Sequence, residues 1–329
     1  MRIWVRTEAS TRIGLGHFMR CYALAEEARM QGHEVVFLIN DIAEAAIQRL
    51  LNLGIRCRHL DTSIGTPQDV AALRAVIAPG EVIVSDSYAI GPDYYNDLYT
   101  DYILVAMDDL AVVRPLNVHL LINAAPSAET RPYDQIAPYA VKCLGPAYAL
   151  IRHEFRQTYP LPPRGHVSVM FGGSDPYGFT ARCAEALADM GAAEIRLIAG
   201  PAHNDVDSLR ALCAGREECR LYLSPDNVAE VLSGATLVVT AAGGSLNEVA
   251  AMKLCALGLV VADNQASWLL SSPFPMLDAR NGWPEGFEAT VCTLLDRPDV
   301  RSSIAMRAHA QIDGRGCERV LSAIASLTL

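Results

Sequence analysis

The sequence contains no closely spaced cysteine pair. Its nine cysteines are scattered along the chain, and no C-x-x-C motif occurs. No two of its eight histidines have the H-x-x-x-H spacing of metal ligands on one helix. These absences predict a chain without a disulfide framework or a metal site, in a reducing compartment that we take to be the cytoplasm.

Long hydrophobic runs and an excess of basic residues are also missing. The longest apolar run, Leu254–Ala262, is too short to span a membrane, and the apolar start Ile3–Val5 is interrupted by Arg6 and Glu8, unlike a signal peptide. Lys and Arg number 27 against 37 Asp and Glu, which gives a net charge of −10. We therefore expect neither nucleic acid nor a membrane as a partner, whereas a small anionic molecule fits a locally positive site.

Hydrophobic residues make up 51 % of the 329 residues and charged residues 19 %, which is enough for two full cores. Segments with strand and helix patterns alternate, beginning with a strand at Arg2–Arg6 and a helix after His17, and the alternation starts again at Val167. This predicts an α/β fold with two doubly wound parallel sheets whose strand ends face an interdomain cleft.

Prolines mark the expected domain boundary. Three of them fall in four positions of the segment Tyr159–Gly165, which excludes both helix and sheet there. We place the domains at 1–159 and 160–329, with the last helices packing back toward the first domain. Thr66 followed by Pro67 predicts a capped helix start. Residues 124–139 are expected to be a loop, and Gly145–Arg152 to lead into a helix that reaches Gln157.

Three glycine-bearing loops follow predicted strands, at Gly14-x-Gly16, Gly172-Gly173 and Gly243-Gly244. Each can offer backbone N–H groups to a phosphate, and each can equally be a tight turn that needs glycine. The first loop lacks the third glycine of a dinucleotide fingerprint, and no G-x-x-x-x-G-K-[ST] motif occurs. A phosphate-bearing ligand other than a dinucleotide is the favoured interpretation.

A few side chains could carry chemistry. His17 stands between a glycine turn and a helix, where it could be a general base or a structural histidine; the other seven histidines lie beside arginines or in loops and are expected to be structural. Tyr88 could touch a sugar, tune His17, or be an ordinary half-buried tyrosine. Glu248 could bind ribose hydroxyls or complement a helix dipole. Asp108-Asp109 could suggest Mg²⁺, but without a second acidic cluster we interpret Asp108 as a polar residue at a strand end.

The residues resemble a known family, the UDP-2,4-diacetamido-2,4,6-trideoxy-β-L-altropyranose hydrolases of pseudaminic acid biosynthesis. The match is distributed along nearly the whole chain, and the order and spacing of its motifs carry it. They are Arg6–Ser10, Gly14–Arg20, Asp86–Tyr88, Gly145–Phe155, Phe171–Asp175, Gly243–Glu248, Asp263–Gln265 and Asp313–Gly316.

The resemblance implies a GT-B-like fold, no cofactor and no metal, with His17 and Tyr88 in catalytic roles. It implies hydrolysis of a UDP-linked sugar by C–O cleavage with inversion, the UDP being bound mainly by the second domain. The alternative is a GT-B glycosyltransferase that uses a UDP-sugar donor. The expected substrate-binding residues are Gly14, Gly16, Arg20, Asp86, Gly172, Gly173, Ser174, Gly243, Gly244, Ser245, Glu248, Asn264 and Gln265.

Overall fold

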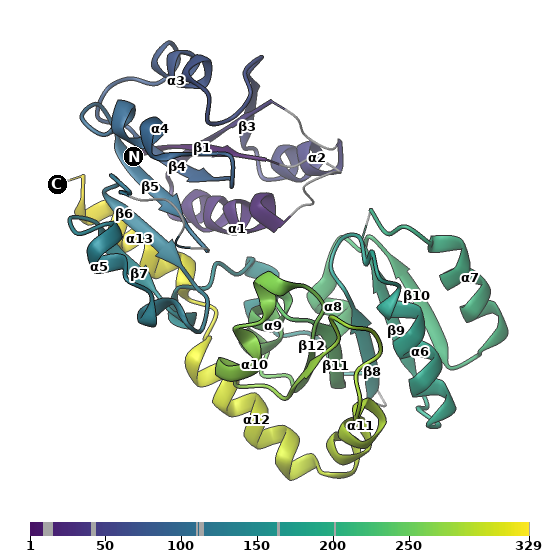
Figure 1. The fold of residues 1–329 in the computed structure, drawn as a ribbon. Coiled ribbons are helices and arrows are strands. Elements are labelled where there is room, and N and C mark those ends of the chain that lie inside the picture. The colour runs from purple at the N-terminus through teal and green to yellow at the C-terminus, as the bar shows by residue number, and fades with distance from the viewer. Residues whose placement is uncertain are drawn as a thin grey trace. The chain divides into compact units, whose positions relative to one another are not determined.

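The chain divides into two compact units in a computed structural model that describes residues 1–8, 16–40, 44–109, 111, 115–162, 165–200 and 202–328. The first unit comprises residues 1–153 and 315–329, and the second comprises residues 154–314. Figure 1 shows that each unit is a sheet covered by helices.

The first unit is built on a seven-stranded parallel sheet in the order β3-β2-β1-β4-β5-β6-β7. The strands are β1 (Arg2–Thr7), β2 (Glu34–Ile39), β3 (Arg56–His59), β4 (Val82–Asp86), β5 (Ile103–Met107), β6 (Leu120–Asn123) and β7 (Val141–Leu144). The order reverses direction between β1 and β4, which is the switch point where doubly wound sheets bind ligands.

Alternating side chains of these strands enter two cores, because successive residues of a strand point to opposite faces. Ile3 and Val5 lie in one core, and Trp4 lies in the other. Residues of α1 (Gly16–Met30), α2 (Glu44–Asn52) and α13 (Gly316–Ser326) cover the first face, and residues of α3 (Pro67–Arg74), α4 (Pro92–Leu98) and α5 (Tyr133–Ile136) cover the second. The C-terminal helix α13, yellow in Figure 1, therefore belongs to the first unit.

The second unit repeats the plan with six parallel strands in the order β10-β9-β8-β11-β12-β13. They are β8 (His166–Met170), β9 (Ile195–Ala199), β10 (Cys219–Leu223), β11 (Ala235–Ala241), β12 (Ala256–Val260) and β13 (Met276–Asp278). The helices are α6 (Phe179–Asp189), α7 (Val206–Gly215), α8 (Val228–Leu232), α9 (Gly244–Ala251), α10 (Trp268–Ser271), α11 (Phe287–Asp296) and α12 (Pro298–Gln311). Its switch point lies between β8 and β11.

The two doubly wound parallel sheets confirm the predicted fold class, and the start of α3 is as expected. Thr66 caps this helix by accepting a hydrogen bond from the Asp69 N–H at 3.2 Å, and Pro67 is its first residue. The predicted loop over residues 124–139 contains the single helical turn of α5, and the four-residue strand β7 follows it. So short an apolar segment carries too little periodicity to be recognised in the sequence.

The predicted helix reaching Gln157 is wrong, since the segment forms only two 3₁₀ turns, Pro146–Tyr148 and His153–Arg156. Tertiary contacts override the local pattern. Ala149 lies between the turns, and its carbonyl is so close to the backbone of Gly316 that any side chain at position 316 would collide with it. The His153 N–H donates to Glu26 Oε2 of α1 at 2.7 Å, which holds the segment against the first unit's helices.

The proline-containing segment packs on the second unit. Tyr159 donates a hydrogen bond to the Glu154 carbonyl at 2.9 Å and accepts one from Asn227 Nδ2 at 3.0 Å. Pro162 contacts the backbone of Gly234, whose φ of 75° favours glycine. All nine cysteines are free thiols. Within the described residues, no helix is long and apolar enough to cross a membrane.

Candidate functional site

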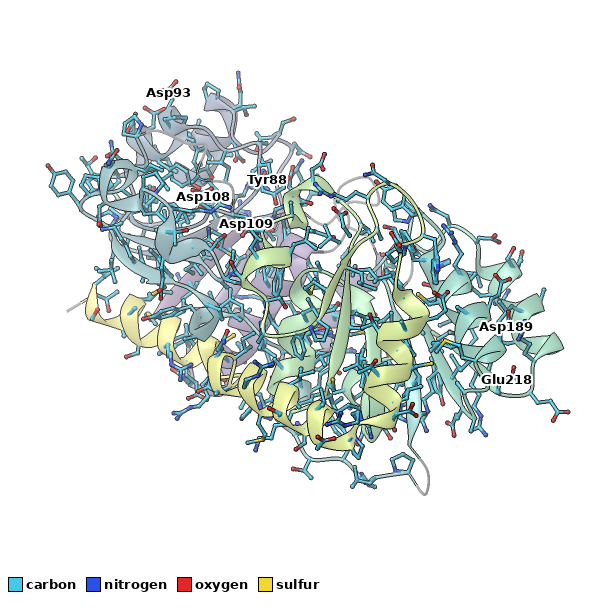
Figure 2. The ribbon with its side chains drawn as sticks, turned by 60° about the horizontal axis from the view of Figure 1, so that its bottom comes forward. Tyr88, Asp93, Asp108, Asp109, Asp189 and Glu218 are labelled. Carbon is cyan, nitrogen blue, oxygen red and sulfur yellow. The ribbon has the colours of Figure 1, made fainter. Side chains whose placement is uncertain are left out.

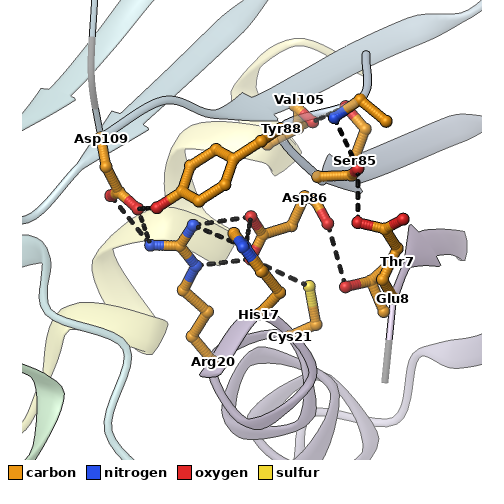
Figure 3. Close-up of polar contacts among 12 residues, drawn as sticks. Thr7, Glu8, His17, Arg20, Cys21, Ser85, Asp86, Tyr88, Val105 and Asp109 are labelled. Atoms are coloured by element: carbon orange, nitrogen blue, oxygen red, sulfur yellow. Dashed lines mark hydrogen bonds and ion pairs between the residues drawn. The ribbon is translucent and has the colours of Figure 1, made fainter. Parts of the chain in front are cut away.

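The ends of β1, β4 and β5 bring the predicted catalytic residues of the first unit together. Thr7, the last residue of β1, pairs in register with Asp86, the last residue of β4, and the Thr7 hydroxyl donates to the Asp86 carbonyl at 3.1 Å. Helix α1 follows β1, so its first turn lies over the end of β4. The site therefore occupies the first unit's switch point. Figure 3 shows the side chains that meet there.

His17 lies in the first turn of α1 and is 8 % exposed. Its Nδ1 lies 2.7 Å from Asp86 Oδ1, and Asp86 is only 1 % exposed. Burial alone would raise the pKa of Asp86, but the charge and hydrogen bonds of Arg20, and then His17, hold this pKa below its ordinary value. Asp86 is therefore an ionised acceptor, so that Nδ1 donates to it and Nε2 is the nitrogen that can take a proton.

Arg20 holds this pair from one helical turn further along α1. Its Nε donates to Asp86 Oδ2 at 2.5 Å, its Nη2 donates to Asp86 Oδ1 at 2.6 Å, and its Nη1 reaches both oxygens of Asp109 at 2.8 and 2.7 Å. Although burial opposes the charged form, the two carboxylates raise the pKa of Arg20 well above its ordinary value. The guanidinium thus joins two carboxylates, and its predicted contact with a ligand stays a prediction.

Tyr88 packs against His17 with ring centroids 4.6 Å apart at an angle of 85°. Its hydroxyl donates to Asp109 Oδ2 at 3.3 Å, and the residue is 58 % exposed. Desolvation of the hydroxyl, followed by the charge of Asp109, raises the pKa of Tyr88 to about 12, so the phenol stays protonated near neutral pH. A protonated, exposed phenol beside His17 can donate a hydrogen bond to a ligand.

Asp109 is the member of this cluster that sequence reasoning missed, because the pair Asp108-Asp109 suggests a metal or a polar strand end and gives Asp109 no role of its own. The two neighbours have separate roles: Asp108 Oδ1 accepts from the Ala111 N–H at 2.9 Å, whereas Asp109 binds Arg20 and Tyr88. Figure 2 shows both aspartates near Tyr88. The available signal was that β5 is the next strand along the chain after β4, and consecutive strands of a parallel sheet are usually neighbours, so the residues after both reach the same edge. Among the described residues, no group of three or more His, Cys, Asp or Glu could hold a metal.

Charge distinguishes this cluster from a phosphate site. The carboxylates of Asp86 and Asp109 and the guanidinium of Arg20 together carry one net negative charge when His17 is neutral. Cys21 adds none, because burial and the charge of Asp86 raise the pKa of its thiol well above the ordinary value. Such a cluster accepts a proton readily and repels a phosphate. Gly16 is the first residue of α1, and Gly14 lies outside the described residues.

The predicted substrate-binding residues of the second unit also gather at a switch point. The Gly172-Gly173 turn follows β8, and Gly243-Gly244 follows β11, the adjacent strand. Gly172 has a φ of 76°, which favours glycine, and a Cβ on Gly200 would lie 2.5 Å from Gly173 Cα. The first turn is therefore also needed structurally, because it packs closely against the end of β9.

Helix α9 differs from α6 in how it begins. The buried Asp175 accepts from the N–H groups of Phe179 and Thr180, at 3.0 and 2.7 Å, and so caps α6. At the start of α9, no hydrogen bond from a described side chain caps the helix at Gly243, and Gly244 is exposed. Uncapped N–H groups at a helix start are suited to an anion.

Five other predicted residues of this unit follow its strands. Ser174 directly follows the Gly172-Gly173 turn, whereas Ser245 and Glu248 lie in the first two turns of α9; all three are half-buried. Asn264 is exposed in a 3₁₀ turn after β12. The neighbouring Gln265 accepts a hydrogen bond from the Val261 N–H at 3.0 Å through Oε1, which orients its side chain at the end of that strand. The predicted residues of the second unit thus follow three neighbouring strands of one parallel sheet, β8, β11 and β12.

No family model matches the chain. The sequence is 23 % identical over 290 residues to the UDP-2,4-diacetamido-2,4,6-trideoxy-beta-L-altropyranose hydrolase of Campylobacter jejuni, covering 82 % of this chain and 96 % of that protein. It is 22 % identical over 262 residues to an uncharacterised protein of Methanocaldococcus jannaschii, covering 75 % of this chain. The chain aligns with only 53 % of that relative's length, about half.

Solved structures of similar fold cover nearly the whole chain. MurG from Acinetobacter baumannii superposes with a TM-score of 0.66 at 15 % identity, over 99 % of this chain and all of that one. The UDP-GlcNAc 2-epimerase from Neisseria meningitidis does so with a TM-score of 0.64 at 9 % identity, again over 99 % of this chain and all of that one. These likenesses and the two parallel sheets define a GT-B fold.

Proposed function

We propose that this chain hydrolyses a UDP-linked sugar without a metal, using His17 as the general base. One observation carries the proposal: Nδ1 of His17 lies 2.7 Å from the buried Asp86 at the switch point of a GT-B unit. In this arrangement Nε2 is available to accept a proton, and an ionised carboxylate stabilises the imidazolium that forms.

The reaction follows from these roles. Nε2 of His17 removes a proton from a water molecule as the water oxygen bonds to the anomeric carbon of the sugar. The bond between that carbon and the diphosphate oxygen breaks, and its electron pair leaves with UDP. Because UDP is a good leaving group, attack on carbon needs a positioned base more than a strong acid. Entry of the water opposite UDP inverts the anomeric centre.

The second unit is proposed to bind UDP. The uncapped start of α9 at Gly243, Gly244 and Ser245 offers N–H groups to the diphosphate, and the helix dipole favours negative charge there. Glu248 is proposed to bind the ribose hydroxyls. The Gly172-Gly173 turn with Ser174, and Asn264 with Gln265, complete the proposed substrate contacts. This division assigns the anion to the second unit and leaves the negative cluster of the first unit to proton transfer.

The proposed sugar is a 2,4-diacetamido-2,4,6-trideoxyhexose, destined for pseudaminic acid or a related nonulosonic acid. The C. jejuni relative, aligned over 96 % of its length, supports this choice. The fold is shared with MurG, so a glycosyltransferase is the second candidate. The absence of a basic excess in the sequence does not favour it, since such an enzyme needs a surface for its acceptor and often for a membrane.

One experiment separates these candidates. The protein is incubated with UDP-2,4-diacetamido-2,4,6-trideoxy-β-L-altropyranose, and separately with UDP-N-acetylglucosamine, in EDTA, and UDP release is followed by ³¹P NMR. We expect release without any acceptor, ¹⁸O from labelled water in the sugar and not in UDP, and loss of turnover in His17→Phe with UDP binding retained. Turnover by His17→Phe at the wild-type rate refutes the base assignment, and release only with an acceptor favours the transferase.

A further inference from the structure

Asp109 is the outermost member of the charged cluster and has no role in the reaction described above. It lies two residues beyond the end of β5, and its side chain is 30 % exposed. Its two oxygens accept from Arg20 Nη1 at 2.8 and 2.7 Å, and one of them also accepts from the Tyr88 hydroxyl at 3.3 Å. Asp109 therefore contacts both residues that flank His17, as Figure 3 shows.

The contact with Arg20 connects Asp109 to the imidazole. Arg20 uses Nε and Nη2 for Asp86, and Asp86 accepts from His17 Nδ1. A planar guanidinium bound by carboxylates on two edges has little freedom to rotate. Asp109 thus fixes the plane of Arg20, which in turn fixes the carboxylate that orients His17.

The contact with Tyr88 acts from the other side of the imidazole. The Tyr88 ring lies edge to face with His17 at 4.6 Å, although most of the tyrosine is exposed. An exposed aromatic side chain keeps one orientation when its polar end is anchored, and Asp109 supplies that anchor at 3.3 Å. One carboxylate therefore positions neighbours on two sides of the proposed base.

Among the described residues, the titratable groups around His17 lie on α1 and at the ends of β1, β4 and β5; Glu8, which follows β1, accepts from Ser87 Oγ at 2.7 Å. Arg20 and Cys21 lie on its own helix, Asp86 and Tyr88 on β4 and the residues after it, and Asp109 acts through Arg20. The thiol and the phenol are neutral near pH 7, because their pKa values are raised. Protonation of His17 thus takes the cluster from one net negative charge to zero.

We infer that Asp109 is a positioning residue for His17, because it holds Arg20 and Tyr88 in place and shares the charge of Arg20. This inference rests on the proposed function, in which His17 is the base. Without Asp109, Asp86 is the one carboxylate among the described residues that binds Arg20, whose Nη2 also lies 3.2 Å from His17 Nδ1, and the cluster is already neutral before His17 takes a proton. The imidazolium is then less stabilised, and the base becomes weaker.

Asp109→Asn tests the inference, with Asp108→Asn as the matched control. The control removes the same charge one residue away, from a side chain that accepts from the Ala111 N–H instead of Arg20. The imidazole of His17, assigned with His17→Gln, is titrated by ¹H–¹⁵N NMR in each folded variant. We expect the His17 pKa to fall by about 0.5–1 unit in Asp109→Asn, by less than about 0.2 in Asp108→Asn, and to stay near wild type in Asp109→Glu.

Kinetics provide the second readout. The acidic limb of the kcat/KM profile should move to lower pH in Asp109→Asn, and kcat should fall about tenfold with KM nearly unchanged. Equal pKa shifts in the Asp108 and Asp109 variants, or no shift in Asp109→Asn, overturn the inference. The NMR titration needs no substrate, so a shift confined to Asp109→Asn supports the positioning role even when wild-type protein releases no UDP. Failure of the wild-type protein to release UDP contradicts the proposed function but leaves the inference about Asp109 standing.

Discussion

Asp86→Asn provides the sharpest test of the His17 site, because it keeps the shape of the side chain and changes one hydrogen-bonding atom. At either position, the new amide nitrogen faces a donor. In the place of Oδ1 it faces His17 Nδ1 and Arg20 Nη2, and in the place of Oδ2 it faces Arg20 Nε. The first orientation forces Nδ1 to become an acceptor and places the proton on Nε2, so the base is lost.

The magnitudes follow from these contacts. A hydrogen bond to a charged group contributes about 1.5–3 kcal/mol, and a buried donor left unpaired costs about 1–3 kcal/mol. With Asp86 only 1 % exposed, we expect the free energy of unfolding to fall by about 3–5 kcal/mol. Loss of the correct tautomer should lower kcat by about 10³–10⁴-fold, equivalent to about 4–5.5 kcal/mol in the barrier. UDP affinity should stay within about threefold.

Asp69→Asn is the matched control for this variant. Asp69 is fully buried in the same unit and accepts from Arg6 Nε and Nη2, Thr62 Oγ1 and the Gly65 N–H. The substitution should cost similar stability in urea unfolding, while kcat per folded molecule, measured by UDP release, changes less than about tenfold. Folded Asp86→Asn with kcat within tenfold of wild type refutes the tautomer argument, as does an equal loss of kcat in Asp69→Asn.

Three further predictions concern the second unit and the dependence of turnover on a metal. Gly244→Asp should keep or slightly raise thermal stability, because a Cβ at this position meets no described atom and an acidic side chain is favourable at a helix start. It should nevertheless weaken UDP binding, measured by calorimetry, more than tenfold, and unchanged binding argues against the α9 site. Burial, and then the charge of Arg196, lower the pKa of His166 to about 4. The contribution of neutral His166 to the free energy of unfolding should therefore be fully present above about pH 6.5, the pKa of an unfolded histidine, and the free energy of unfolding should fall by about 3 kcal/mol as the pH drops to 4. His166→Leu should remove this pH dependence of the free energy of unfolding, measured by urea unfolding. If the pH dependence persists, another group causes it and the prediction for His166 is wrong. EDTA should leave turnover within about twofold, and restoration by Mg²⁺ of activity lost in EDTA would contradict metal-independent cleavage.

The sequence determined which residues end the strands, and the tertiary structure decided how they pair. Strand patterns placed polar residues after β1 and β4, and parallel sheets align such ends at one edge, so His17, Asp86 and Tyr88 could be expected to meet. The local sequence pattern says little about short segments held by distant contacts, such as β7 or Ala149, which lies against Gly316.

The charged cluster depends on long-range geometry in the same way. Arg20 and Asp109 are 89 positions apart, and the pairing of β1 with β4 and of β4 with β5 brings Arg20 Nη1 to 2.8 and 2.7 Å from the two carboxylate oxygens of Asp109. Opposite charges that far apart in a sequence have many possible partners, so composition and spacing cannot choose among them. The sequence by itself thus determined the two doubly wound sheets and the candidate base, because periodicity is local. The tertiary structure decided what orients that base, because an ion pair requires a particular register of neighbouring strands.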